Sequence, residues 1–313
     1  MSRVLVTGSA GFIGSSLVEE LLSLGHEVIG VDSLTDYYSP DLKSRNLQVA
    51  LKSANYKFIN GDLNELDLIQ LLDSIDVVFH QAGQPGVRKS WGTDFDIYTD
   101  QNIRATQRLL EAAKVSKISK FVYASSSSIY GSSKTYPVTE ANLPVPNSPY
   151  GVTKLSAEQL CVLYAKNFSV PTVSLRYFTV YGPRQRPDMA FTRFIMAGLA
   201  GDEIEVFGNG EQIRDFTFIS DVVAANIAVG FQDVPSGSVF NVAGGGSVTL
   251  NEAIAVIERL IGSSLKIKYK ETVSGDVIQT GGSTQLLESQ TGWKPKVSLE
   301  VGLARHVEWA REL

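Results

Sequence analysis

The chain of 313 residues contains one cysteine and three histidines, and both scarcities exclude kinds of site. The single thiol, Cys161, cannot form an intramolecular disulfide, which favours a reducing compartment and a cytoplasmic location. It lies within an apolar run at residues 160–163, so we interpret it as a core residue rather than a nucleophile. The histidines, His26, His80 and His306, lack the spacing of metal ligands, so we expect no metal site.

Long hydrophobic runs and an excess of basic charge are also missing. No stretch reaches the roughly 18–20 apolar residues of a membrane span, and the first residues lead into a strand pattern instead of a signal peptide. The net charge of -5 argues against a nucleic-acid-binding protein but leaves room for a small anionic ligand. With 43% hydrophobic and 19% charged residues, the composition is that of a folded globular protein.

Short apolar, β-branched runs alternate with amphipathic stretches through the first half of the chain. The runs lie at residues 4–6, 28–31, 56–59, 77–80, 121–124 and 172–176, and amphipathic stretches lie between them at 14–24, 66–72, 102–113 and 150–168. Strands at this spacing with helical connections predict parallel βαβ units. We therefore expect an α/β fold built on a doubly wound parallel sheet of the Rossmann type.

After about residue 180 the rhythm changes to shorter elements interrupted by glycine and proline. A helical pattern returns at 251–262, and an apolar run at 239–242 is expected to join the sheet. We predict a first domain over residues 1–180, which also takes segments near 215–245, and a smaller, interleaved domain over 181–313.

A glycine-rich turn directly follows the first predicted strand. The spacing of Gly8, Gly11 and Gly14 lets a backbone approach a pyrophosphate, and the helix that begins here directs free N–H groups toward the phosphates. Asp32 ends the second strand, where a carboxylate can bind a ribose 2′-hydroxyl and repels a 2′-phosphate, so the pattern favours NAD over NADP. Asp62, after the third strand, either accepts from the adenine amino group or caps a helix.

A tyrosine and a lysine stand four residues apart at two places in the chain. Tyr150 and Lys154 follow Ser148-Pro149, a helix start, so they lie on one helix face, where the cation favours the phenolate and makes an acid/base group. Tyr130 and Lys134 fall in a glycine- and serine-rich segment, which does not predict helical stacking.

Four serines, 125–128, end a predicted strand at the edge where open α/β sheets bind ligands. One of these hydroxyls could orient the oxygen on which Tyr150 acts. The alternative is a serine-rich turn.

Taken in this order, the motifs resemble the extended short-chain dehydrogenase/reductase family, and within it the nucleotide-sugar epimerases and dehydratases. The resemblance covers essentially the whole chain and is most detailed for UDP-glucuronate 4-epimerases. These share Asp36-Tyr37-Tyr38, Leu42-Lys43-Ser44-Arg45, Gly86-Val87-Arg88 and the segment 178–189. The resemblance implies an NAD-dependent isomerase that inverts C4 of a UDP-sugar through a transient 4-keto intermediate.

The resemblance also implies roles for individual residues. Ser126, Tyr150 and Lys154 take the catalytic positions. The cofactor positions are Gly8, Gly11, Phe12, Ile13, Gly14, Asp32, Lys43, Asp62, Leu63, Ala82, Gln84, Tyr150 and Lys154. The substrate positions are Arg88, Ser127, Ser128, Thr179, Arg186, Arg214 and Asp276.

Within the substrate positions, a carboxylate subsite distinguishes a uronate from a neutral hexose. We assign Thr179 and Arg186 to the sugar carboxylate, because a guanidinium binds a carboxylate through two parallel hydrogen bonds. Arg214 matches a residue that neutralises the pyrophosphate, Asp276 one that faces a ribose, and Arg88 suits either the phosphates or the carboxylate. Arg184 and Arg186 could instead be surface charges on a loop.

Other activities of the family remain as alternatives. UDP-glucose or UDP-N-acetylglucosamine 4-epimerase is the first of them. The dTDP-glucose 4,6-dehydratases carry Asp-Glu where this chain has Ser127 and Ser128, and UDP-glucuronate decarboxylases keep a Glu at the second position. A non-catalytic NAD-binding scaffold would not require the intact Tyr150 and Lys154 pair. The helices at 102–115 and 150–168 carry extra apolar positions, and the resemblance implies that these helices pair across a two-fold axis, so we expect a homodimer.

Overall fold

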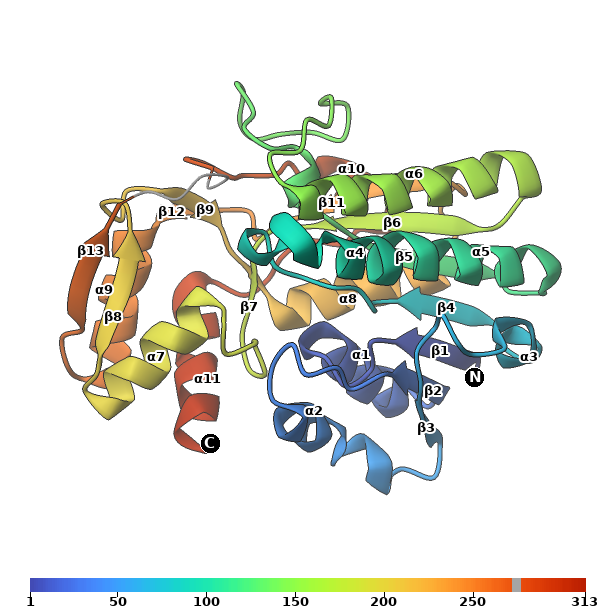
Figure 1. The fold of residues 1–313 in the computed structure, drawn as a ribbon, viewed down its shortest axis with the longest axis horizontal. Helices are drawn as coiled ribbons and strands as arrows, with labels where there is room; N and C mark the ends of the chain where they lie inside the picture. The colour runs from blue at the N-terminus through green and yellow to red at the C-terminus, as the bar shows by residue number, and fades with distance from the viewer. Residues whose placement is uncertain (272–276) are drawn as a thin grey trace.

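The apolar, β-branched runs form the strands of one parallel sheet in a computed structural model that describes residues 1–271 and 277–313 (Figure 1). Its seven strands lie in the order β3-β2-β1-β4-β5-β6-β11. The strands are β1 (Arg3–Thr7), β2 (Glu27–Asp32), β3 (Tyr56–Asn60), β4 (Val77–His80), β5 (Lys120–Ser126), β6 (Thr172–Tyr177) and β11 (Ser238–Val242). The chain reverses its winding direction between β1 and β4, which is where ligands bind in such sheets. The predicted α/β fold with a doubly wound parallel sheet is confirmed.

Helices cover both faces of this sheet. On one face α1 (Phe12–Ser23) packs against α8 (Ile219–Phe231), and on the other lie α3 (Leu68–Leu72), α5 (Ala105–Val115) and α6 (Pro149–Phe168). Successive strand residues therefore enter different cores. In β1, Val4 and Val6 pack in the core with α1 and α8, whereas Leu5 packs in the core with α5 and α6.

The two helices most relevant to the site begin differently. Helix α6 begins as the sequence predicts, because Ser148 accepts a hydrogen bond from the N–H of Gly151 at 3.1 Å and Pro149 occupies the first turn. The stretch predicted as one helix from residue 102 is interrupted. A short helix α4 (Phe95–Tyr98) passes through a π-helical segment, Thr99–Arg104, before α5 begins.

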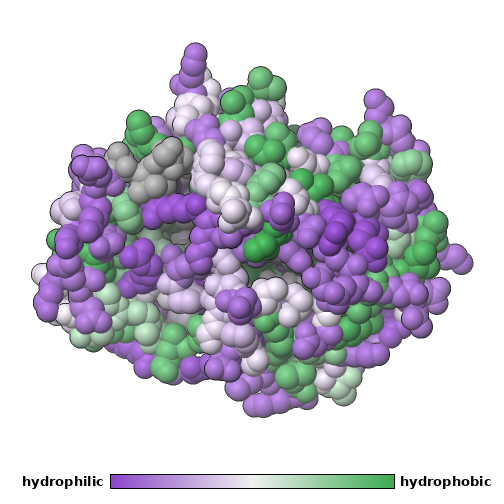
Figure 2. Space-filling model, viewed as in Figure 1, coloured by the Kyte–Doolittle hydropathy of each residue, from purple (hydrophilic) through white to green (hydrophobic). Residues whose placement is uncertain are grey.

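The C-terminal half supplies elements to the sheet and a smaller lobe beside it. Strands β8 (Glu203–Phe207) and β13 (Lys266–Lys270) form a parallel pair in this lobe. The other strands and α-helices of this half are β7 (Val180–Tyr181), α7 (Ala190–Ala200), β9 (Ile213–Asp215), β10 (Thr217–Phe218), β12 (Ser247–Thr249), α9 (Leu250–Ile261), α10 (Gln285–Thr291) and α11 (Leu299–Arg311), and α2 (Pro40–Leu47) lies between β2 and β3 in the N-terminal half. One hydrophobic core runs from the sheet into this lobe, and Figure 2 shows a hollow between the two parts near the middle of one face.

The scarce residue types occupy structural positions. Cys161 is fully buried in α6, and His26 stacks on Phe231 with ring centroids 4.5 Å apart. His80 and His306 are also buried, and burial lowers the pKa of each to about 3. Within residues 1–271 and 277–313, no group of three histidine, cysteine or acidic side chains is arranged to hold a metal, and no helix is long and apolar enough to cross a membrane.

Candidate active site

The glycine-rich turn after β1 has no room for side chains at two of its positions. Gly8 has φ of 69°, and a Cβ on it would lie 2.7 Å from the backbone nitrogen of Ala82, which follows β4. A Cβ on Gly14 would collide with the carbonyl oxygen of Gly8. The glycines therefore let β1, β4 and the start of α1 pack at backbone contact distance.

The first turn of α1 and the carboxylate of Asp32 lie together at the carboxyl edge of the sheet. Gly11 precedes the helix and no side chain caps its N-terminus, so the first N–H groups are available to an anion. Asp32 Oδ2 accepts a hydrogen bond from Ala10 N at 3.1 Å, and its Oδ1 accepts one from Leu34 N at 2.8 Å. This carboxylate thus holds the turn as well as facing the cavity beside it.

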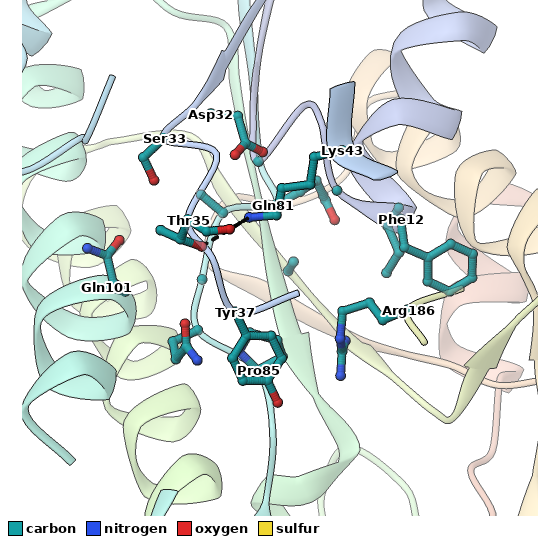
Figure 3. A pocket seen from close by; sticks show the side chains of 18 of the residues that line it. Phe12, Asp32, Ser33, Thr35, Tyr37, Lys43, Gln81, Pro85, Gln101 and Arg186 are labelled. Atoms are coloured by element: carbon teal, nitrogen blue, oxygen red, sulfur yellow. Dashed lines mark hydrogen bonds between the residues drawn. The ribbon is translucent and has the colours of Figure 1, made fainter. Parts of the chain in front are cut away.

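A single elongated cavity extends from this turn to helix α6 (Figure 3). In Figure 3, Gln101 approaches it from one side, and Phe12 and Arg186 approach it from the other. The predicted site residues that line it are Gly8, Gly11, Phe12, Ile13, Gly14, Asp32, Lys43, Leu63, Ala82, Gln84, Tyr150, Lys154 and Arg186. The structure thus brings together residues from seven separate parts of the chain.

Lys43 and Asp62, two further predicted cofactor residues, also have partners within the protein. Lys43 is buried, and its Nζ donates to the carbonyl oxygen of Thr35 at 2.7 Å and to the hydroxyl of Thr35 at 3.0 Å (Figure 3). Asp62 is not among the residues that line the cavity. Its Oδ1 accepts from Asn64 N at 2.7 Å and its Oδ2 from Gln101 Nε2 at 2.9 Å, so it orients a side chain that does line the cavity.

Tyr150 and Lys154 lie one turn apart on α6 and both line the cavity. Burial raises the pKa of the Tyr150 phenol, while a hydrogen bond with the Ser126 hydroxyl and the charge of Arg186 act in the opposite direction. Burial lowers the pKa of Lys154 to about 8. Ser126, at the end of β5, also accepts a hydrogen bond from Ser128 N at 3.1 Å, which fixes its hydroxyl oxygen beside the phenol.

The second tyrosine and lysine pair has a different environment. Tyr130 follows a 3-10 turn and is buried, with its hydroxyl donating to Asn241 Oδ1 at 2.7 Å and accepting from Arg176 Nη1 at 2.6 Å. Lys134 is exposed in an irregular segment. Neither residue lines the cavity, and the segment is not an α-helix, as its glycine and serine content predicts.

A buried ion pair lies one turn beyond Lys154. Glu158 is fully buried and binds Arg176 through two hydrogen bonds, of 2.7 Å and 3.0 Å. The same carboxylate accepts a 2.6 Å hydrogen bond from the hydroxyl of Ser125, which lines the cavity. The pair therefore fixes α6 against β5 and β6 directly behind the tyrosine and lysine.

Arg186 lies at the wall of the cavity, on the loop after β7. Its Nε and Nη2 donate to the two carboxylate oxygens of Asp188 at 2.9 and 3.0 Å. The guanidinium carbon is 5.7 Å from the centroid of the Tyr37 ring, which also lines the cavity. Arg184 instead pairs with Glu19 at 2.7 Å and is not among the residues that line this cavity.

The other predicted substrate residues lie outside the lining of this cavity. Ser127 and Ser128 form the 3-10 turn after Ser126, and Thr179 lies between β6 and β7. The guanidinium carbon of Arg88 lies 4.2 Å from the centroid of the Phe207 ring. Arg214 in β9 donates a hydrogen bond from Nη1 to the carbonyl oxygen of Ile213 at 2.8 Å. Asp276 lies outside the residues that the structure describes.

Several cavity residues carry no sequence prediction. Tyr37 and Tyr38 line the cavity, although the sequence alone assigns them no function. They belong to the shared Asp-Tyr-Tyr motif, which could have indicated that they lie in the site. Gln101 lies in the π-helical segment, and Tyr177 ends β6 with its hydroxyl 3.1 Å from Gln81 Oε1. The further lining residues are Val31, Ser33, Thr35, Gly61, Gln81, Gly83, Pro85, Ala124 and Ser125, the last of which is one of the four serines expected to offer a hydroxyl.

Known proteins resemble the chain over nearly its whole length. The family described as "NAD dependent epimerase/dehydratase family" matches residues 4–243. The chain is 42% identical over 312 residues to an uncharacterized UDP-glucose epimerase of Bacillus subtilis, covering 99% of this chain and 98% of that protein. It is 38% identical over 320 residues to the UDP-glucuronate 4-epimerase of Thermodesulfobacterium geofontis, covering 100% of this chain and 97% of that protein.

A solved structure is also similar in fold and sequence. The UDP-glucuronic acid 4-epimerase from Bacillus cereus, in complex with UDP-glucuronic acid and NAD, matches with a TM-score of 0.96. The two are 43% identical, and the match covers 99% of each chain.

Proposed function

Because this chain belongs to the NAD-dependent epimerase/dehydratase family, we propose that it is an isomerase that uses NAD to invert C4 of UDP-glucuronate, forming UDP-galacturonate. The observation that carries the proposal is the arrangement of one cavity. It has the glycine turn and Asp32 at one end, Tyr150 and Lys154 at the other, and Arg186 in its wall.

The residues at the glycine turn fit NAD. A Cβ on Gly8 or Gly14 would fill the space at the turn, the start of α1 offers N–H groups to a pyrophosphate, and Asp32 offers a carboxylate oxygen to a ribose hydroxyl. Lys43, Leu63, Ala82 and Gln84 complete the walls of the same cavity. When bound there, NAD would supply a reversible hydride acceptor for C4 of the sugar.

The side chains of α6 and β5 move and hold the proton of the 4-hydroxyl. Tyr150 acts as the base that takes this proton and later as the acid that returns it. The Lys154 ammonium, one turn away, favours the phenolate. Ser126, hydrogen-bonded to Tyr150, orients the sugar oxygen so that the phenol and the hydroxyl share one proton.

A carboxylate at C5 gives the sugar its specificity in this proposal. Arg186 binds it with two parallel hydrogen bonds, and Thr179 adds a hydroxyl donor. Because a 4-keto sugar beside a carboxylate readily loses CO2, these contacts also keep the carboxylate out of the geometry that favours cleavage. Arg214 binds the pyrophosphate, Arg88 binds either the phosphates or the carboxylate, Ser127 and Ser128 bind the sugar, and Asp276 binds a ribose.

A second candidate activity is 4-epimerisation of UDP-glucose. The relative in Bacillus subtilis carries that name, and Asp188 already neutralises Arg186, so the cavity wall does not require an anionic sugar. Dehydration and decarboxylation are less favoured, because Ser127 and Ser128 supply no carboxyl group for proton transfer.

The decisive experiment uses the purified protein without added cofactor. We expect UDP-glucuronate to be converted into UDP-galacturonate, followed by NMR, and UDP-glucose to be converted more slowly. Equal or faster conversion of UDP-glucose would favour the second candidate. No conversion of either sugar after NAD is added would contradict both.

We also propose that the protein is a cytoplasmic homodimer and that each chain has two domains with their boundary near residue 180. Val152 and Leu163 are exposed on one face of α6, and Phe168 is half exposed at its end, which supports a contact between copies through α5 and α6. The buried free thiol of Cys161 suits a reducing compartment. Residues 1–180, with segments near 215–245, would hold NAD, and residues 181–313 the UDP-sugar. Sedimentation of the purified protein tests the dimer.

A further inference from the structure

We propose that Asp188 is a positioning residue for sugar specificity, holding one edge of the Arg186 guanidinium so that the other edge stays open to a carboxylate. The inference rests on the proposed function, because it requires Arg186 to bind the uronate. It adds a residue that has no assigned role in the site above.

Arg186 uses the N–H groups of one edge of its guanidinium to bind Asp188. Its Nε donates to Asp188 Oδ1 at 2.9 Å and its Nη2 donates to Asp188 Oδ2 at 3.0 Å, so both bonds lie along one edge of the planar group. Among residues 1–271 and 277–313, these two bonds are the hydrogen bonds of the guanidinium that lie within 3.5 Å, and the Tyr37 hydroxyl also interacts with both Arg186 and Asp188. Nη1 and the second hydrogen of Nη2 form another edge, which matches a carboxylate in geometry and charge.

The local backbone produces this clamp. A hydrogen bond of 3.1 Å from Met189 N to the carbonyl oxygen of Arg186 closes a turn that brings Asp188 back beside Arg186. The guanidinium side chain is mostly shielded, with 18% of it exposed, whereas 39% of the Asp188 side chain is exposed. The turn thus supports the arginine from its solvent side and leaves it lining the cavity.

Tyr37 supports the guanidinium from another direction. Its ring centroid lies 5.7 Å from the guanidinium carbon, and its hydroxyl packs against Gly86, where a Cβ would lie 2.5 Å away. The charge of Arg186 also acts on the Tyr150 phenol, lowering its pKa against the effect of burial, which is consistent with a guanidinium close to the reacting oxygen. Asp188 and Tyr37 therefore limit an otherwise flexible side chain to one orientation.

A bound uronate and a bound neutral hexose use this clamp differently. The uronate gains two charge-assisted hydrogen bonds from the open edge, whereas the hexose has no carboxylate to place there. Loss of Asp188 should therefore weaken the binding of UDP-glucuronate more than the binding of UDP-glucose. If Asp188 instead competed with the substrate carboxylate for Arg186, its removal would strengthen the binding of UDP-glucuronate, which is the opposite result.

The test measures the dissociation constants of UDP-glucuronate and UDP-glucose by calorimetry with the NAD-saturated protein. The variants are Asp188→Asn, Asp188→Ala, Arg186→Met and the double variant Asp188→Asn with Arg186→Met. Glu300→Gln, which breaks an exposed ion pair with Arg259 on the far lobe, is the matched control. The dissociation constant of UDP is measured as well. UDP lacks the sugar and its carboxylate, so unchanged UDP binding indicates that a variant retains its fold.

We expect both Asp188 variants to reduce the preference for UDP-glucuronate about tenfold while UDP-glucose binding and its kcat change by less than about twofold. Asp188→Asn should have no further effect when Arg186 is already Met, since Asp188 acts through Arg186. Glu300→Gln should match the wild type.

Three results would overturn the inference. The preference could stay within about twofold of the wild type in both Asp188 variants, it could rise, or it could fall further when Asp188→Asn is added to Arg186→Met. If Arg186→Met itself preserves the preference, the proposed carboxylate site is wrong and the inference fails with it. If Arg186→Met removes the preference and the Asp188 variants do not change it, the proposed function stands and the role of Asp188 is rejected.

Discussion

The ammonium nitrogen of Lys154 lies 4.5 Å from the centroid of the Tyr123 ring, so a cation lies over the ring of a fully buried tyrosine. Cation–π attraction partly replaces the hydration that the ammonium loses on burial. Burial nevertheless lowers the pKa of Lys154 to about 8, with Cys161 and Glu158 acting in the opposite direction. The charge of this residue is therefore sensitive to pH close to neutrality.

We predict that kcat/KM for UDP-glucuronate falls as the pH rises through about 8, because Lys154 then loses the charge that favours the Tyr150 phenolate. Lys154→Met should lower kcat about a hundredfold or more and remove this alkaline limb. A pH profile of the initial rates checks both results. Lys134→Met, at the other tyrosine and lysine pair, should keep the wild-type profile; a profile altered equally by both substitutions would contradict the assignment.

Replacing Tyr150 by Phe should lower kcat about a thousandfold, since the group proposed to move the 4-hydroxyl proton is lost. Binding of UDP-glucuronate, measured by calorimetry, should remain within a few fold of the wild type, about 1 kcal/mol or less.

The matched variant Tyr130→Phe removes a hydroxyl that bonds to Asn241 and Arg176. It should lower the free energy of unfolding by about 1–3 kcal/mol without a comparable loss of kcat. A larger catalytic loss in Tyr130→Phe than in Tyr150→Phe would reverse the roles given to the two tyrosines.

Gly8→Ala should destabilise the protein by about 2–5 kcal/mol and abolish NAD binding, because the new Cβ would meet the backbone of Ala82 at 2.7 Å. Gly25→Ala is the control, since Gly25 also has a positive φ, of 82°, but nothing lies within 4 Å of the added Cβ. That variant should lose about 1 kcal/mol and bind NAD normally. Chemical denaturation and fluorescence titration with NAD distinguish the two, and equal effects would show that backbone strain alone is responsible.

Glu158→Gln should lower the free energy of unfolding by about 3–5 kcal/mol, because it leaves the buried guanidinium of Arg176 without its charge partner. Glu300→Gln breaks an ion pair whose two side chains are mostly exposed, so it should cost less than about 1 kcal/mol. Urea titrations of both variants measure the difference. A cost below about 1 kcal/mol for Glu158→Gln would mean that Arg176 finds other partners.

Features that depend on neighbouring residues in the chain were predictable. The strand runs, the glycine turn and the start of α6 at Ser148 follow from local pattern, and the sheet then brings Asp32 and the turn to one edge. The helix interval of four residues likewise brings Tyr150 and Lys154 into one cavity.

Features that arise from tertiary contacts were not predictable. The hydrogen bond from Gln101 to Asp62 joins elements far apart in the chain, and its geometry depends on a π-helical segment that no propensity indicates. Arg186 and Asp188 are close in sequence, but their hydrogen bonds depend on a turn in the loop whose conformation the pattern of charges does not specify.

The place of β11 at the edge of the sheet has a consequence for biosynthesis. Its residues Ser238–Val242 pair with β6, which ends at Tyr177, so about sixty residues, among them α7, β8 and the sheet-covering α8, are made between two adjacent strands. During synthesis, the outer edge of β6 stays unpaired until the ribosome has passed Val242. A nascent chain released near residue 200 would expose that apolar edge, which is a template for association with other strands. Completion of the sheet thus depends on prior synthesis of α7, β8 and α8, which lie between β6 and β11 in the chain.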